Sequence, residues 1–131
     1  MENPACYSDN IRGSLNLLEA MVKFKVPKII FSSTAAVYGK PRYLPIDEQH
    51  PTVPTNYYGF TKLETEEFIQ WYGRLKGIRY VLLRYFNVAG DAGLHYVDQN
   101  PGNLIPILMD VLTGHREALT IFGNDYPTRD G

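Results

Sequence analysis

Two short apolar runs separated by a helical stretch limit the folds that this chain can adopt. The runs are residues 28–33 (KIIFSS) and 79–86 (RYVLLRYF), rich in β-branched and aromatic side chains. Residues 57–75 place apolar side chains at loosely helical spacing, and Gly77 marks the end of that helix. Residues 34–56 contain four prolines and are expected to form an ordered but irregular loop. A strand, a helix and a second strand in this order indicate a parallel sheet and hence an α/β fold.

Three further elements are predicted around this unit. Apolar residues recur at spacings of three and four from Ile11 to Val22, which predicts a helix with possible caps at residues 8–10. Residues 103–113 are expected to form a helix that Asn103 can cap, and residues 118–123 a third short strand. The continuous apolar character of the first run is typical of a strand that is covered on both faces.

Composition and charge exclude several classes of function. The 131 residues carry a net charge of −1, which argues against a generic nucleic-acid-binding surface. No run of about 18 apolar residues exists, so no membrane-spanning helix is expected. Cys6 is the only cysteine, which excludes an internal disulfide and a thiolate metal cluster and fits a reducing cytoplasm. The three histidines lack ligand spacing, so no metal site is expected.

Polar and aromatic side chains follow both predicted strands at the point where each ends. Residues 32–34 (SST) end the first strand, and residues 85–87 (YFN) end the second. Residues 57–62 (YYGFTK) open the intervening helix. Ligands of open parallel sheets bind outside the carboxyl ends of the strands, so these three segments are expected to line one site.

Tyr58 and Lys62 are the candidate acid/base pair of this site. They are four residues apart at the start of a helix, so their side chains share one face. A nearby ammonium stabilises a phenolate, and the positive end of the helix dipole acts in the same direction. The spacing alone is equally typical of an ordinary surface pair, so its meaning depends on the residues around it.

Those surrounding motifs identify the chain as a member of a known family. The order Ser/Thr, then Tyr58-x-x-x-Lys62, resembles the set that characterises the short-chain dehydrogenases/reductases. FSSTAAVYG (31–39) is similar to the extended, nucleotide-sugar branch, and LLRYFNVAG (82–90) and LTIFGNDYPTRDG (119–131) resemble its UDP-sugar 4-epimerases in particular. The helix with Asn10 also matches. The resemblance implies a partial Rossmann-like parallel sheet over residues 1–86 and the start of a nucleotide-sugar-binding region over residues 87–131.

The same resemblance implies a reaction and a set of roles. UDP-glucose and UDP-galactose would interconvert through transient oxidation at the sugar C4, with NAD as a tightly held cofactor. Tyr58 would take the proton of the sugar 4-hydroxyl, Lys62 would hold the nicotinamide ribose, and Thr34 would bond the reacting oxygen. The further cofactor contacts would be Asn10, Ser32, Ser33, Tyr85 and Phe86. The UDP-sugar would contact Thr34, Tyr58, Asn87, Asn103, Leu104, Thr120, Ile121 and Phe122.

Several alternatives stay open beside these roles. Ser32 and Ser33 also suit a strand end that a ligand approaches closely, and Leu104, Ile121 and Phe122 also suit plain core packing. Sugar 4,6-dehydratases of the branch carry an Asp-Glu pair after the catalytic threonine, where this chain has Ala35 and Ala36. That difference disfavours dehydration.

A 4-epimerase acting on UDP-N-acetylglucosamine or UDP-glucuronate is the alternative substrate class. Glucuronate needs a cationic pocket, and Arg42, Arg84 and Arg129 sit at no obvious site in the sequence. A non-catalytic remnant is the alternative outside the enzymes, because no G-x-x-G-x-x-G phosphate loop occurs in these residues. We therefore expect a fragment that lacks the glycine-rich cofactor segment and the C-terminal part, and that is inactive in isolation. The family also implies a homodimer through the helices around residues 10–25 and 57–75.

Overall fold

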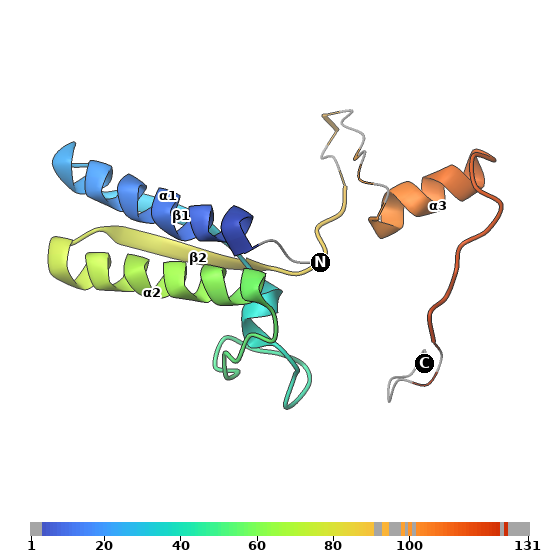
Figure 1. The fold of residues 1–131 in the computed structure, drawn as a ribbon, viewed down its shortest axis with the longest axis horizontal. Helices are drawn as coiled ribbons and strands as arrows, with labels where there is room; N and C mark the ends of the chain where they lie inside the picture. Colours follow the sequence, from blue (N-terminus) through green and yellow to red (C-terminus); the bar gives the residue numbers. More distant parts are fainter. Residues whose placement is uncertain are drawn as a thin grey trace. The chain divides into compact units, whose positions relative to one another are not determined.

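The computed structural model describes residues 4–90, 93–94, 98, 100, 102–123 and 125. The elements in chain order are α1 (Pro4–Lys23), β1 (Lys28–Thr34), the 3-10 helix η1 (Ala35–Tyr38), α2 (Tyr57–Lys76), β2 (Arg79–Tyr85) and α3 (Leu104–Leu112) (Figure 1). The chain divides into two compact units, residues 1–87 and 88–131, and each is described by itself.

The two strands of the first unit form a parallel pair. Lys28 lies opposite Arg79 and the register continues to Thr34 opposite Tyr85. Parallel strands need a long crossover, and here it contains α2. The predicted α/β fold with a parallel sheet is therefore confirmed. The register brings the carboxyl ends of both strands to one edge of the sheet, where the site residues were expected.

The core of the first unit lies between one face of the sheet and the two long helices, which run side by side (Figure 1). Leu18 and Met21 of α1 meet Ile69 of α2 in a buried cluster. The cluster is completed by buried Ile78 and by the partly buried Ile29, Phe31, Phe68, Tyr72 and Leu82. Ile30 points to the other face and is 71% exposed. The prediction that the first strand is covered on both faces is thus wrong, because the described helices cover only one face.

Local signals explain where the helices begin and end. The side chain of Asn56 accepts a 2.7 Å hydrogen bond from the Gly59 amide and caps α2. Gly77 closes α2 in the left-handed conformation that favours glycine. The first helix begins at Pro4, earlier than its apolar stripe predicts, because proline is tolerated in a first helical turn. Ser8 is therefore no cap; its hydroxyl donates back to the Pro4 carbonyl at 2.9 Å.

The second unit contains α3 and an irregular tail in its described residues. Asn103 takes the cap position of α3, but its side-chain amide donates to the Asp98 carboxylate at 2.7 Å and makes no capping bond. Residues 118–123 are irregular, so the predicted third strand is wrong. An apolar, β-prone segment becomes a strand only where a neighbouring strand pairs with its backbone, and no such partner is found among the described residues. Asn124 and residues 126–131 of the LTIFGNDYPTRDG motif lie outside the described residues.

No helix in the described part of the chain combines the length and the apolar character that crossing a membrane requires.

Candidate active site

Thr34 lies at the junction of β1 and η1. It is the last residue of β1 and the cap of η1, and its Oγ1 accepts a 3.2 Å hydrogen bond from the Ala36 amide. Tyr85 is its register partner on β2. A hydroxyl that accepts a bond can still donate its own hydrogen, so half-buried Thr34 can present a donor at the strand ends.

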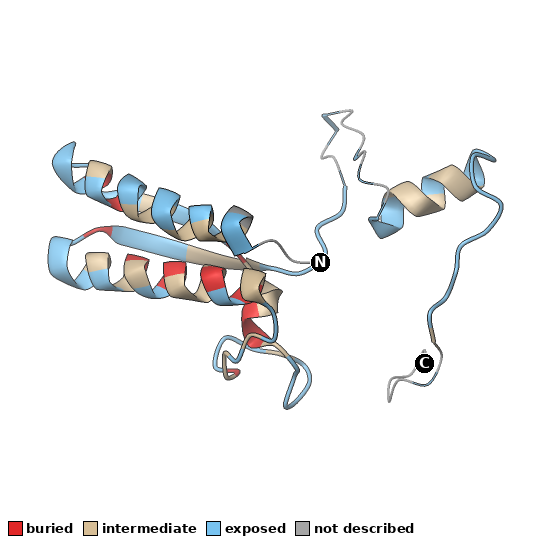
Figure 2. Cartoon of the chain, viewed as in Figure 1, coloured by how far each residue is buried: buried red, intermediate tan, exposed pale blue. Residues whose placement is uncertain are grey.

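A close approach of two backbones brings the start of α2 to the same place. A Cβ atom added at Gly59 would lie 2.5 Å from the carbonyl oxygen of Ala36 in η1. Only glycine allows the first turn of α2 to rest directly on η1 at this distance. Buried residues gather where the two elements meet (Figure 2). Tyr58, the neighbour of Gly59, is thereby held beside the turn that Thr34 caps.

Lys62 lies one helical turn beyond Tyr58 and turns toward β1. Its ammonium donates a 3.0 Å hydrogen bond to the Ser32 carbonyl and lies 4.9 Å from the centre of the Phe31 ring. The distance from the ammonium to the centre of the Tyr58 ring is 5.9 Å. Burial lowers the pKa of Lys62. A partly desolvated cation therefore lies beside the Tyr58 phenol at the start of α2.

Tyr7 of α1 is a neighbour of Tyr58 that the sequence reasoning missed. The centres of the two rings are 5.5 Å apart at an angle of 52°. The adjacent Tyr57 hydroxyl and the Ser8 Oγ lie 3.0 Å apart, which ties the same turns of the two helices together. Tyr7 precedes Asn10 by three residues and so shares its helix face, which is the signal that could have indicated it.

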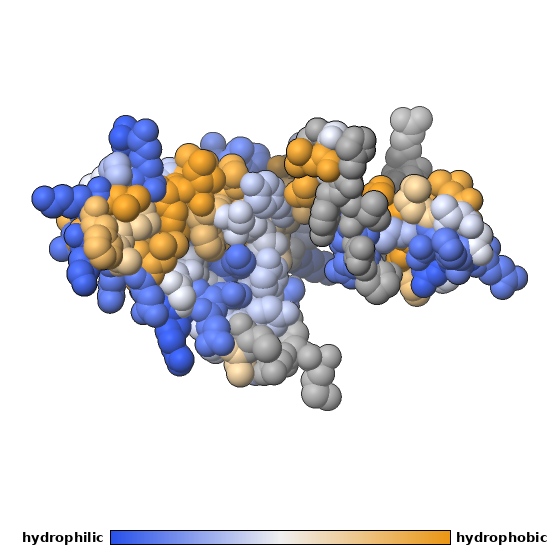
Figure 3. Space-filling model, turned by 90° about the horizontal axis from the view of Figure 1, so that it is seen from above, coloured by the Kyte–Doolittle hydropathy of each residue, from blue (hydrophilic) through white to orange (hydrophobic). Residues whose placement is uncertain are grey.

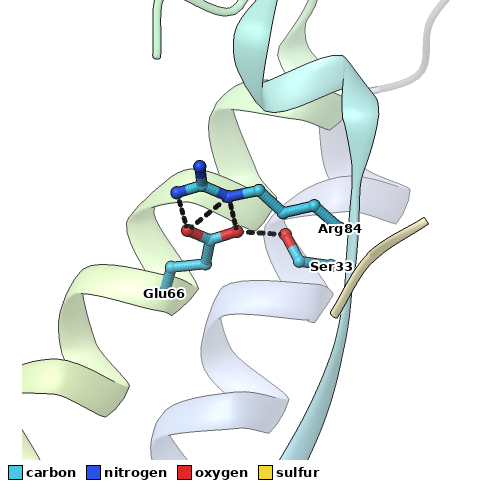
Figure 4. A network of polar contacts seen from close by, with 3 residues as sticks. All are labelled: Ser33, Glu66 and Arg84. Atoms are coloured by element: carbon cyan, nitrogen blue, oxygen red, sulfur yellow. Dashed lines mark hydrogen bonds and ion pairs between the residues drawn. The ribbon is translucent and has the colours of Figure 1, made fainter. Parts of the chain in front are cut away.

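A buried ionic network lies one turn further along α2 (Figure 4). Glu66 has no solvent exposure, and Arg84 of β2 donates to it from Nε at 3.0 and 3.2 Å and from Nη2 at 2.6 Å. Ser33 of β1 donates its hydroxyl to the same carboxylate. The bonds to Glu66 raise the pKa of Arg84, burial opposes this rise, and contact with Tyr38 adds to it. The sequence had shown no obvious site for Arg84.

The other predicted residues of the first unit divide by exposure. Asn10 is half-buried in α1, whereas Ser32 is exposed and Ser33 is buried with its hydroxyl engaged by Glu66. Tyr85 is 43% exposed and Phe86 60% exposed. The Phe86 ring stacks near Tyr38 at 6.4 Å, and Asn87 is exposed. The first unit thus gathers the predicted catalytic residues Thr34, Tyr58 and Lys62 with Ser32, Ser33 and Tyr85.

The predicted substrate residues of the second unit are all exposed there. Ile121 is 79% exposed and Phe122 96% exposed, so neither packs into a core of the described residues. The remaining three are Asn103, Leu104 and Thr120. Among the described residues, no group of three His, Cys, Asp or Glu side chains could hold a metal ion.

The family of the chain follows from comparison with known sequences. The profile of the NAD dependent epimerase/dehydratase family matches residues 1–130. The chain therefore belongs to that family, and the resemblance indicated by its motifs is confirmed. The site just described contains the Ser/Thr, tyrosine and lysine of those motifs.

Several curated relatives of this chain share one name. UDP-glucose 4-epimerase of Lacticaseibacillus casei is 46% identical over 135 residues, which is all of this chain and 41% of that protein. The protein of the same name from Halalkalibacterium halodurans is 48% identical over 128 residues, or 95% of this chain and 38% of that protein. The chain thus spans about two fifths of these relatives.

Solved structures agree with the sequence relatives. The crystal structure of UDP-glucose 4-epimerase from Brucella ovis in complex with NAD matches with a TM-score of 0.85 at 39% identity, covering 95% of this chain and 39% of that one. UDP-glucose 4-epimerase from Bifidobacterium longum in complex with NAD+ and UDP matches with a TM-score of 0.78 at 42% identity, over the same shares.

Proposed function

We propose that this chain carries the proton-transfer site of a UDP-glucose 4-epimerase. The observation that carries the proposal is the half-buried Lys62 ammonium, 5.9 Å from the Tyr58 ring at the start of α2 and beside the turn capped by Thr34. Relatives bearing that name match the whole length of the chain at 46% identity. The reaction is the interconversion of UDP-glucose and UDP-galactose, an isomerisation.

Each residue of the set has a distinct task in this reaction. The Tyr58 phenolate takes the proton of the sugar 4-hydroxyl as C4 is oxidised, and returns it when C4 is reduced from the other face. Lys62 stabilises the phenolate through its charge. Thr34 donates a hydrogen bond to the reacting oxygen and holds it in line with Tyr58.

NAD, when bound, supplies the acceptor and the donor of the hydride. The residues at the strand ends fit its nicotinamide end. Lys62 offers a cationic donor for ribose hydroxyls, and exposed Ser32 leaves room for a ligand beside it. Tyr85 and Phe86 offer partly exposed aromatic faces, and Asn10 a polar group on α1. We assign these residues to the cofactor, whereas the engaged hydroxyl of Ser33 suits a supporting role.

The charges of the site favour a neutral hexose. Arg84 is held by Glu66 through three short contacts, so it offers no free cation for the carboxylate of glucuronate. Ala35 and Ala36 carry no carboxyl group for elimination of water. We assign the nucleotide-sugar contacts to Asn87 of the first unit and to Asn103, Leu104, Thr120, Ile121 and Phe122 of the second.

We further propose that the protein is a homodimer that buries faces of α1 and α2. Large apolar side chains are exposed on both helices: Leu17 at 52%, Trp71 at 53% and Leu75 at 70%. The first unit shows gathered apolar surface in the left half of Figure 3. Exposed apolar surface of this kind commonly marks a protein interface.

A chimera tests the proposed activity. Residues 4–123 of this chain would replace the matching segment of the Lacticaseibacillus casei relative, and the purified protein would be given NAD and UDP-galactose. We expect UDP-glucose to form. A chimera that folds and binds NAD but forms no UDP-glucose would contradict the proposal. The chain alone, assayed in parallel, shows whether these residues suffice for turnover.

A further inference from the structure

The network of Ser33, Glu66 and Arg84 joins three elements at one level of the fold (Figure 4). Ser33 and Arg84 are register partners on the two strands, and Glu66 of α2 reaches both side chains. The Arg84 guanidinium also lies 4.9 Å from the centre of the Tyr38 ring, which brings in η1. A single carboxylate therefore holds α2 to both strands and indirectly to η1.

The residues of the network are neighbours in sequence of the residues of the site. Glu66 follows Lys62 by four residues and Tyr58 by eight, so the three side chains occupy successive turns on one face of α2. On the strands, the residues after Ser33 and Arg84 are Thr34 and Tyr85. Each residue of the network is thus adjacent to a site residue on the same element, or one helical turn away from it.

The hydrogen-bonding geometry of the network favours one position of α2 along the two strands. Apolar contacts between a helix and a sheet are non-directional and tolerate small sliding motions. A fully buried carboxylate held by a guanidinium fork does not, because both oxygens need their donors in one geometry. A shift of α2 along the strands would leave the Glu66 charge buried and unpaired.

We propose that Ser33, Glu66 and Arg84 form a positioning clamp that fixes α2 along the strand ends and so holds Lys62 and Tyr58 in register with Thr34. The inference rests on the proposed function for the roles of Tyr58 and Lys62. In this proposal the clamp acts through the turns that precede it in α2, and not through contact with the reacting atoms. A shift of α2 would change the hydrogen bond from Lys62 to the Ser32 carbonyl, so the environment of Lys62 reports on the clamp.

Arg84→Lys in the full chain tests the clamp without changing the net charge near Lys62. Lysine keeps a cation beside Glu66 but cannot form the fork. The Lys62 titration would be followed by lysine side-chain NMR, with its signal assigned by its loss in Lys62→Arg. We expect the midpoint of this titration to rise by about half a pH unit in Arg84→Lys, because the ammonium becomes more exposed to water. Ile69→Val is the matched control: it loosens the buried core on the same helix without a polar contact. It should lower the melting temperature and leave the Lys62 titration unchanged.

The outcomes separate positioning from mere stability. A folded Arg84→Lys chain with an unchanged Lys62 titration overturns the inference. If Arg84→Lys does not fold, Ser33→Ala removes one contact to Glu66 without any change of charge, and the same criterion applies. In the active chimera, Arg84→Lys should lower kcat on the order of tenfold while KM for UDP-galactose changes little. An inactive unsubstituted chimera would count against the proposed function, whereas the NMR result on the chain judges the clamp independently.

Discussion

Lys62 shows at the scale of one residue how packing adjusts a charge. Its ammonium lies 4.9 Å from the centre of the Phe31 ring and 5.9 Å from that of Tyr58, and it donates a hydrogen bond to the Ser32 carbonyl. Burial lowers the pKa of Lys62 for that reason, because a charge in a less polar environment is disfavoured. The unfolded chain therefore binds more protons at this group than the folded chain does just below the ordinary lysine pKa of 10.5.

Lys62→Met should reveal this difference through the pH dependence of stability. Stability rises with pH wherever the unfolded state binds more protons, so Lys62 makes the native chain gain stability as pH rises toward the ordinary lysine pKa. We expect the free energy of unfolding, measured by urea denaturation, to rise less steeply for Lys62→Met across that range. Lys76→Met, which alters an exposed lysine at the end of α2, is the control. Parallel curves for Lys62→Met and the native chain would show that burial does not act on this group.

At the scale of elements, α2 carries most of the site. Its cap, its first turn on η1 and its buried glutamate all decide where Tyr58 and Lys62 point. The close approach at Gly59 is the tightest of these constraints, since the nearest atom to an added Cβ is backbone and cannot rotate away.

Two glycine substitutions should therefore change stability in opposite directions. Gly59→Ala should lower the free energy of unfolding by about 1–2 kcal/mol, because the new methyl group forces α2 away from η1. Gly13→Ala in α1 meets no atom within 4 Å and should raise it by about 0.5–1 kcal/mol through helix propensity. Chemical denaturation measures both. A Gly59→Ala chain as stable as the Gly13→Ala chain would refute the close contact.

Sequence reasoning succeeded where the signals are local. The two apolar runs predicted both strands, and apolar side chains at helical spacing predicted α2. The four-residue spacing predicted that Tyr58 and Lys62 share a face. The ion pair of Glu66 and Arg84 escaped it, because the partners are 18 residues apart and meet only when α2 packs on the sheet. The third strand was wrongly predicted from 118–123, since β propensity describes a segment and pairing needs a neighbour.

At the scale of the whole molecule, the exposed apolar side chains of α1 and α2 support the proposed homodimer. Leu17→Glu should weaken the proposed dimer at least about tenfold, because a charge in an apolar contact loses its water without gaining a partner. Sedimentation of native and variant chains over a range of concentrations measures this. Leu112→Glu is the control, since Leu112 is 79% exposed but lies on α3. Equal dissociation of both variants, or a native chain that stays monomeric, would contradict an interface on α1 and α2.

If Tyr58 exchanges the proton of the sugar 4-hydroxyl, turnover depends on its phenolic oxygen. Tyr58→Phe and Tyr72→Phe would be compared in the chimera by the rate of UDP-glucose formation from UDP-galactose with NAD. Tyr72 is a suitable control because it lies on the same helix but packs against the core. We expect Tyr58→Phe to lower kcat by about 10²–10⁴-fold and Tyr72→Phe to stay near the unsubstituted rate. A Tyr58→Phe chimera that turns over as fast as the Tyr72→Phe chimera would contradict it.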